Sequence, residues 1–198
     1  MTWANAKIKR IYVGESLVYP VVYCDFTKSD CGFTWLWTND TSWYTTHWID
    51  SNWLYLASTR AANFVWAWLI PSSIYSKWTI RKIELEFNST GTQNWWWICT
   101  KTAQYDAYTL RTWRNNIDNI YNSTNTQNTV TNPSGIYTLT IDLENWKEKI
   151  TNSSEFTIPS NLVSWFNTNI PSGNVWICAM RSNLNTSTIY IKSAKFYF

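Results

Sequence analysis

Apolar and polar residues alternate along the stretch from Asn132 to Thr151. From Tyr137 to Leu143, every second residue is apolar, and Thr or Asp occupies the positions between. This period of two is typical of a strand with one buried face and one solvated face. A Pro-Ser-Gly turn at 133–135 precedes the strand, and a charged strand from Lys147 to Thr151 follows it. The stretch therefore predicts a β-hairpin.

The rest of the chain repeats this pattern in short segments bounded by Gly, Pro, Asn or Ser, and helical periodicity is almost absent. We expect about ten to twelve strands, with one helical turn at 160–166 that Ser160 caps. In the last segment, the residues expected to face inward are at odd positions up to Ile191 and at even positions from Phe196 onward. This change predicts one extra residue, a β-bulge, near Ser193 and Ala194. The further predicted strands are Lys7–Val13, Leu17–Tyr19, Asn63–Ile70, Thr79–Asn88, Trp95–Thr100, Glu155–Ile158, Asn174–Arg181 and Thr188–Phe198.

The opening hairpin has a recognisable pattern, I-x-x-I-Y-x-G-x-x-x-V-x-P. It resembles the short N-terminal segment that precedes a distal domain in many phage tail and virion-associated proteins. The resemblance implies that residues 1–20 attach the protein to other particle proteins, and an ordinary edge hairpin is the alternative. The matching residues are Ile8, Ile11, Tyr12, Gly14, Val18 and Pro20.

The chain from Val21 onward resembles jelly-roll sugar-binding modules and lectin-like sandwiches. In those folds, a strand ending in Asp-Phe leads to a loop, and an N-G-L-x-L strand follows. The resemblance implies an all-β fold in which residues 21–198 form an antiparallel jelly-roll β-sandwich. The matching residues are Asp25, Phe26, Asn52, Leu54 and Leu56.

Two carboxylates, Glu84 and Glu86, share one face of the strand Thr79–Asn88 with Lys82. The pair resembles the catalytic strand of lectin-like-sandwich glucanases, in which an acid and a nucleophile lie about 5 Å apart. The Asp of that motif is missing here, and the second Glu is too near the first. A solvated face is therefore the favoured interpretation of these two residues.

The composition of the chain limits the binding partners and the cellular location that we expect. The net charge is +3 with 15% charged residues, which does not indicate a nucleic acid or an anionic membrane as partner. No apolar run approaches the roughly 20 residues of a membrane span, and MTWANAKIKR lacks the apolar core of a signal peptide. We expect a virion-associated or extracellular protein that carries no visible signal peptide.

Four cysteines and one histidine provide no zinc pattern. Cys99 and Cys178 occur in similar strand contexts, WWICT and VWICA, which is compatible with the two cysteines facing each other across neighbouring strands. Buried free thiols are the favoured interpretation, and a disulfide between them is the alternative. A Gly-rich phosphate loop and a G-x-S-x-G elbow are absent from the sequence, and no spacing supports a triad around His47. The sequence thus predicts no catalytic residue, no metal and no cofactor.

Sixteen Trp and five Gly reverse the usual ratio, since average usage predicts roughly 14 Gly in this length. Trp53, Trp95 and Trp146 each follow Asn, where Asn-Gly turns belong. We therefore hypothesise that most of these positions are glycine in the native protein, read from UGA codons that some bacterial and phage codes assign to glycine. Trp165 is the position most easily accepted as a true Trp. The alternative is a Trp-rich surface that stacks on sugar rings.

The segment Lys101–Thr131 is rich in Asn and Thr and predicts long loops around one short strand, Tyr108–Thr112. Because loops on a rigid sandwich often carry binding residues, we take Tyr105, Tyr108 and Arg111 as candidate carbohydrate-binding residues.

Together these features predict a non-catalytic binding or structural module of a phage or prophage particle that recognises a cell-surface glycan. A homo-oligomer would fit such a particle protein. The alternatives are a glycoside hydrolase or lyase of lectin-like sandwich fold, using Glu84 or Glu86, and a purely structural virion protein.

Overall fold

The computed structural model describes thirteen segments of the chain. Side chains are described at Tyr23, Asp25 and Ile98 and in the ranges 80–88, 135–171 and 190–198. The described segments are 7–13, 16–25, 45–49, 54–58, 64–69, 80–88, 93–99, 108–113, 116–121, 125–131, 135–171, 176–181 and 187–198.

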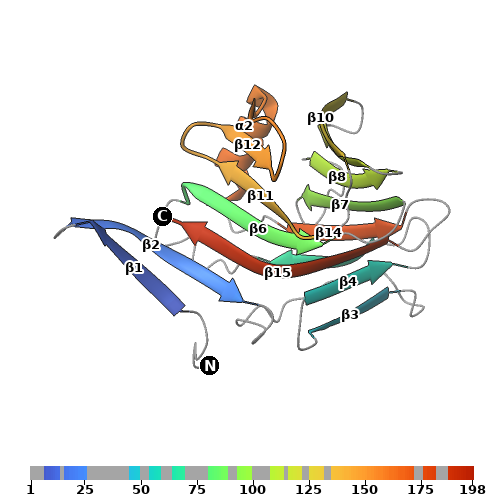
Figure 1. Ribbon diagram of the computed structural model, residues 1–198, viewed down its shortest axis with the longest axis horizontal. Coiled ribbons are helices and arrows are strands. Elements are labelled where there is room, and N and C mark those ends of the chain that lie inside the picture. Colours follow the sequence, from blue (N-terminus) through green and yellow to red (C-terminus); the bar gives the residue numbers. More distant parts are fainter. Residues whose placement is uncertain are drawn as a thin grey trace.

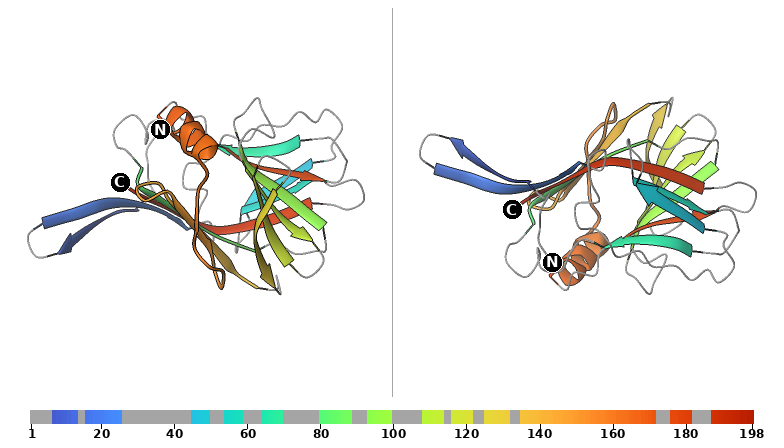
Figure 2. Two further views of the ribbon diagram at one scale, coloured as in Figure 1. Left: turned by 90° about the horizontal axis from the view of Figure 1, so that it is seen from above. Right: turned by 90° about the horizontal axis from the view of Figure 1, so that it is seen from below.

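The described strands form two antiparallel sheets that lie against each other (Figures 1 and 2). The first has nine strands in the order β1-β2-β15-β6-β11-β12-β13, and β4 pairs with both β15 and β3. Its strands are β1 (Lys7–Val13), β2 (Ser16–Asp25), β3 (Thr45–Ile49), β4 (Leu54–Ser58), β6 (Lys82–Asn88), β11 (Tyr137–Asp142), β12 (Lys147–Ile150), β13 (Phe156–Thr157) and β15 (Ser187–Tyr197).

The second sheet has six strands in the order β10-β9-β8-β7-β14-β5. The prediction of an all-β protein built from antiparallel strands is confirmed. The strands of the second sheet are β5 (Phe64–Leu69), β7 (Gln93–Cys99), β8 (Tyr108–Trp113), β9 (Asn116–Tyr121), β10 (Asn125–Thr131) and β14 (Trp176–Arg181).

The core of the described part lies on the inner face of β6, β11 and β15. Exposure alternates strictly along β6 and β11, as their sequence periodicity predicts. Leu139 and Leu85 lie opposite each other in register and are almost completely buried. The other buried apolar residues of these strands are Ile83, Phe87, Tyr137, Ile141, Ile191, Ala194 and Phe196.

The predicted helical turn is a ten-residue helix, α2 (Ser160–Asn169). Its N-cap is Pro159 rather than Ser160, and no side chain caps it, so the predicted cap is wrong by one residue. Proline fits this position because its backbone there is extended, with φ of −68° and ψ of 152°, a conformation that the proline ring allows. The helix buries Leu162 and Phe166 and lies on the same side of the first sheet as β5 and β14 (Figure 2).

The predicted bulge in the last strand is confirmed. Ser193 and Ala194 are consecutive residues, and both are buried. The register of β15 against β6 shifts between Ile191 and Ser193, which leaves Lys192 as the extra residue. The bulge keeps Ile191 and Phe196 on the inner face although they are five positions apart.

In the polar segment 101–131, the sequence predicts long loops around one short strand, Tyr108–Thr112. The strand is confirmed as β8, but the prediction of loops is wrong where β9 and β10 form. Three successive strands, β8, β9 and β10, pair there as neighbours. Thr is a good strand former, and the ladder hydrogen bonds that β8 makes with β7 are invisible in the local sequence.

β1 and the first part of β2 project from the sandwich as a two-stranded arm (Figures 1 and 2). β2 is continuous through Pro20, the residue at which the sequence predicts a domain boundary, and its second half pairs with β15 over Val21–Asp25. The division into residues 1–20 and 21–198 stays a prediction.

Cys99 and Cys178 lie on neighbouring strands, β7 and β14, but they do not face each other. The register pairs Cys99 with Trp176 and Cys178 with Trp97, so the two Trp-Ile-Cys triplets pair with each other about Ile98 and Ile177. The prediction of facing cysteines is wrong by two positions, because local sequence context does not fix register.

The turn between β11 and β12 places Trp146 at a position that favours glycine. It has four residues, 143–146, rather than the two that an Asn-Gly turn would use, since Asp142 pairs with Lys147. Trp146 has φ of +53°, the left-handed backbone conformation that the glycine of an Asn-Gly turn adopts. That conformation is costly for a bulky side chain and free of strain for glycine.

We predict that Trp146→Gly raises the free energy of unfolding by about 1 kcal/mol, because it removes the left-handed strain. Urea denaturation of the two chains measures the difference. The matched control is Trp165→Gly inside α2, where glycine should destabilise the protein by about 1 kcal/mol or more. A stability loss at position 146 as large as that at 165 would contradict the strain.

The recoding hypothesis has a direct test. Mass spectrometry of peptides from the native source, covering Asn132–Thr151, is expected to give glycine at position 146. Tryptophan there, and at positions 53 and 95, would end the hypothesis and leave a strained Trp retained in a turn.

Candidate functional site

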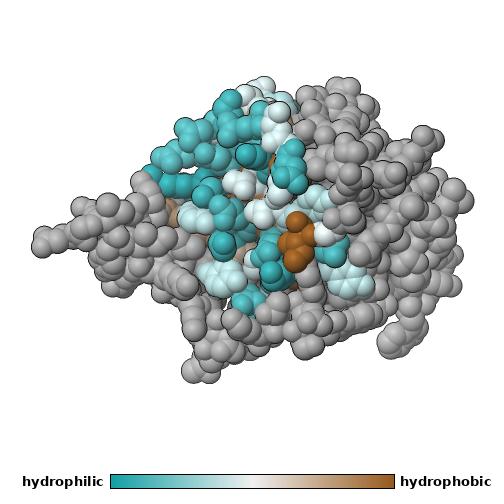
Figure 3. Space-filling model, in the orientation of Figure 1, coloured by the Kyte–Doolittle hydropathy of each residue, from teal (hydrophilic) through white to brown (hydrophobic). Residues whose placement is uncertain are grey.

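The outer face of the first sheet carries a polar surface that spans several neighbouring strands. We call it the polar face, and its members are at least partly exposed. Figure 3 shows hydrophilic residues spread over the described part of this side. The polar face consists of Tyr23, Lys82, Glu84, Glu86, Thr138, Thr140, Asp142, Lys147, Lys149, Lys192, Lys195 and Tyr197.

Glu84 lies at the centre of the polar face, and its side chain is 20% exposed. The Tyr197 hydroxyl donates to its Oε2 at 2.7 Å. Lys82 Nζ lies 3.0 Å from Oε1, and Lys195 Nζ lies 3.8 Å from Oε2. Glu84 is thus more enclosed than the predicted solvated face implies.

These contacts lower the pKa of Glu84 and contribute to the raised pKa of Tyr197. Partial burial by itself would raise the pKa of Glu84, but the hydrogen bond from Tyr197 and the neighbouring Lys82 and Lys195 outweigh it, so the pKa is lowered. Burial, followed by the bond to Glu84 and its charge, raises the pKa of Tyr197. Glu84 is therefore held as a carboxylate and Tyr197 as a neutral phenol.

Glu86 is held by the bulge of β15. Lys192 Nζ lies 3.0 Å from Oε1 of Glu86, and the hydroxyl of Ser193 donates to Oε2 at 3.0 Å. Ser193 is almost completely buried. The extra residue in β15 brings two consecutive side chains to one carboxylate, in keeping with the tendency of bulges to re-aim side chains.

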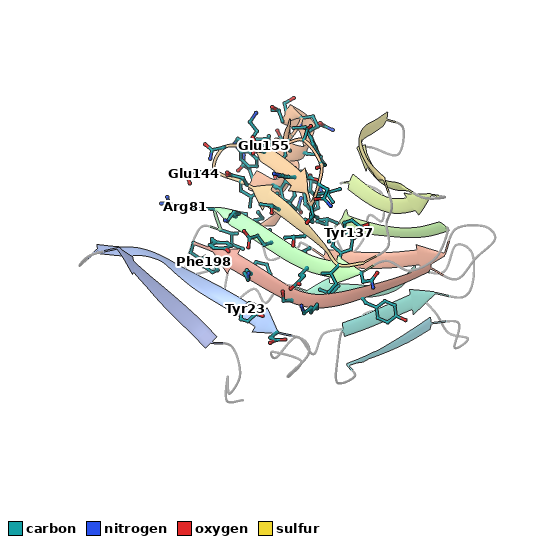
Figure 4. The ribbon with its side chains drawn as sticks, in the orientation of Figure 1. Tyr23, Arg81, Tyr137, Glu144, Glu155 and Phe198 are labelled. Atoms are coloured by element: carbon teal, nitrogen blue, oxygen red, sulfur yellow. The ribbon has the colours of Figure 1, made fainter. Side chains whose placement is uncertain are left out.

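Asp142 closes the hairpin turn. Its Oδ1 accepts the backbone N–H groups of Glu144 and Asn145 at 2.9 and 2.8 Å, and its Oδ2 accepts the Asn145 side-chain amide at 2.9 Å. These bonds, together with Lys82, outweigh the effect of burial and lower the pKa of Asp142. At the same end of the sheet, Arg81 pairs with the exposed Glu144 at 3.1 Å, off the polar face (Figure 4).

The side chains of the predicted site residues lie outside the described part of the chain. Tyr105 lies outside the described residues. Tyr108 and Arg111 lie on β8, in register with Ile98 and Trp95 of β7, and their side chains are not described. The role of these three residues in carbohydrate binding stays a prediction.

Sequence reasoning missed the lysines and the tyrosine that β15 contributes to the polar face. The signal was present, because the parity change that predicts the bulge also sends Lys192, Lys195 and Tyr197 outward. Glu148 was missed too. It is 1% exposed on the inner side of β12, and it has an interaction partner.

No helix among the described residues is both long enough and apolar enough to cross a membrane. No group of three or more His, Cys, Asp or Glu in the described ranges is arranged to hold a metal ion.

The network around Glu84 predicts pH-dependent stability. Because the folded pKa of Glu84 is lowered, its stabilising effect is complete above the unfolded value of 4.5 and is lost as pH falls through the lower folded value. Glu84→Gln should lower the free energy of unfolding by about 1–2 kcal/mol at pH 7. It should also reduce the stability lost between pH 6 and pH 3, as measured by urea denaturation.

The control is Glu155→Gln, which removes an exposed carboxylate that takes no part in the contacts of Glu84. Tyr197→Phe should cost about 1 kcal/mol at pH 7, because the hydroxyl that binds Glu84 is removed. If Glu84→Gln and Glu155→Gln give the same pH profile, the network contributes nothing to stability.

Comparison with known proteins gives similarity of fold only. The chain matches none of the protein-family models and none of the curated proteins with which it was compared. Among solved structures, it is similar to a carbohydrate esterase of the Shiga toxin-encoding bacteriophage phi24B. The TM-score is 0.51 at 9% identity, and the match covers 88% of this chain and 96% of that one.

Other solved structures are similar at lower TM-scores, and two of them illustrate the range. The GH43 protein BlXynB of Bacillus licheniformis, a K247S mutant, matches at 10% identity and a TM-score of 0.48, over 89% of this chain and 39% of that one. The binding domain of botulinum neurotoxin DC, in complex with rat synaptotagmin II, matches at 8% identity and a TM-score of 0.41, over 97% and 47%. At 9% identity, the similarity to the phage esterase supports a β-sandwich-like fold for this chain.

Proposed function

We propose that the chain is a non-catalytic, glycan-binding module of a phage or prophage particle, with a lectin-like jelly-roll sandwich. The observation that carries the proposal is the polar face. It spans several adjacent strands of a rigid sheet and offers tyrosine, lysine and threonine side chains together. Such a surface presents hydrogen-bonding groups over a wide, shallow area, which suits an extended carbohydrate chain better than a small molecule that needs a cavity.

The state of the acidic residues supports binding rather than hydrolysis. A glycosidase needs one carboxylic acid whose pKa is raised, beside a second carboxylate. The pKa of Glu84 is instead lowered, and both oxygens of Glu86 are bound by Lys192 and Ser193. A hydrolase or lyase that uses Glu84 or Glu86 remains the alternative from another class, followed by a structural virion protein without a ligand.

Attachment to a particle is the second part of the proposal. The projecting arm of β1 and β2 contains the I-x-x-I-Y-x-G-x-x-x-V-x-P pattern and provides a surface away from the sandwich for other particle proteins (Figure 2). The fold similarity to a phage protein agrees with this setting. The protein would then be virion-associated or extracellular, as a homo-oligomer in the particle, and would need neither a cofactor nor a nucleic-acid or membrane partner.

Binding to a broad glycan array tests the proposal, and we expect retention of at least one class of surface glycan. Two sets of variants locate the site. Lys82→Gln combined with Lys195→Gln should weaken binding at least roughly tenfold if the polar face is used, since two charge-assisted contacts are lost. If the loop region predicted from sequence is used instead, Tyr105→Ala and Arg111→Gln should have the larger effect.

Two results would count against the proposal. No binding across the array would favour the structural alternative. A bond-cleaving activity that disappears in the double variant Glu84→Gln, Glu86→Gln would establish the enzyme, whereas unchanged activity in that variant would exclude these residues from catalysis.

A further inference from the structure

The carboxylates at the centre of the polar face already hold donors from within the chain. Each oxygen of Glu84, Glu86 and Asp142 has a hydrogen-bond donor or an ammonium group beside it. These three residues therefore have little capacity left to accept hydrogen bonds from a ligand.

Ammonium donors on the same face are in surplus. An ammonium group has three N–H donors, and Lys192 has one carboxylate partner, Glu86. Lys147 donates to the Thr157 hydroxyl at 2.8 Å. Lys149 is exposed and makes no ion pair or side-chain hydrogen bond with the described residues. The face is therefore rich in donors and poor in acceptors.

The tyrosine rings of the face are occupied by lysine. Lys82 Nζ lies 4.0 Å from the centre of the Tyr197 ring, and Lys195 Nζ lies 5.7 Å from the centre of the Tyr23 ring. A neutral sugar that stacks on either ring would have to displace a cation held by cation–π attraction. Stacking of neutral sugars is thus disfavoured at these two positions.

The cations also form a row across the sheet. The register aligns Lys149, Thr140, Glu84 and Lys195 on four neighbouring strands, β12, β11, β6 and β15. Strands lie about 4.8 Å apart, so the backbones at Lys149 and Lys195 are about 14 Å apart. Lys82 lies two residues from Glu84 on the same face of β6. A chain carrying repeated negative groups could contact several cations along this line.

We infer that the polar face binds a carboxylate-bearing polysaccharide, with the ammonium groups of Lys149, Lys82 and Lys195 as the recognising groups. This inference rests on the proposed function and deepens it by naming the class of glycan. The carboxylates of the ligand supply the acceptors that the face lacks, and its negative charge complements the surplus of cations.

The central comparison is between a charged polymer and its esterified form. Polygalacturonate carries one carboxylate per sugar, and its fully methyl-esterified form has the same backbone without the charge; hyaluronan and polysialic acid extend the acidic set. We expect the full chain to bind at least one acidic polymer, by biolayer interferometry, at least tenfold more tightly than the esterified polymer. Binding should weaken as NaCl rises from 50 to 500 mM, because salt screens exposed charges.

Variants identify the face. Lys149→Gln should lower the affinity roughly threefold, as expected for one exposed ionic contact, and Lys149→Glu should lower it further. The matched control is Arg81→Gln, which removes the same charge from the same sheet but off the polar face, and it should leave affinity unchanged. Circular dichroism at 25 °C and urea midpoints verify that each variant is folded.

The outcomes separate the inference from the proposed function. Equal binding to the acidic and esterified polymers, or binding only to neutral glycans on the array, overturns the inference and leaves the proposed function standing. Binding to no glycan at all overturns both. Equal losses in Lys149→Gln and Arg81→Gln, or equal affinity for duplex DNA, would show a general attraction to polyanions and would also overturn the inference.

Discussion

The burial of one face of β6, β11 and β15 is the constraint on which the rest of the described structure depends. Side chains alternate along a strand, so a register slip of one residue would exchange its two faces completely. Leu85 and Leu139, opposite each other and almost completely excluded from water, make such a slip very costly. The positions of Glu84 and Thr140 on the outer face follow from the same register.

The bulge at Lys192 adjusts this constraint in one strand. Without the extra residue, Ile191 and Phe196 could not both face the core, because five positions separate them. With it, Lys192 and Ser193 both reach Glu86, while Lys195 and Tyr197 reach Glu84. The apolar core and the outer network therefore depend on the same local irregularity, and the network is positioned by packing rather than by its own contacts.

The internal pairing of the acidic residues decides what the polar face can do. A carboxylate whose pKa is lowered by a phenol and two lysines is a poor proton donor, yet it holds those lysines in fixed positions. Each ammonium group has three N–H donors, more than its single carboxylate contact requires, which is the basis for the inferred preference for acidic ligands. Thus the feature that argues against hydrolysis also favours recognition of negative charge, and it gives the proposed glycan a specific chemistry.

The sequence by itself determined the strands whose two faces differ in polarity, such as β6, β11 and β15, and also the bulge and the left-handed position at 146. These features are encoded locally, in alternation, in a parity change and in turn chemistry. It did not determine the strands β9 and β10, the offset between Cys99 and Cys178, or the meeting of Glu84 with Tyr197, which is 113 residues away. Tertiary structure decided these, because hydrogen bonding between strands and register depend on which distant segments become neighbours, and no local pattern contains that information.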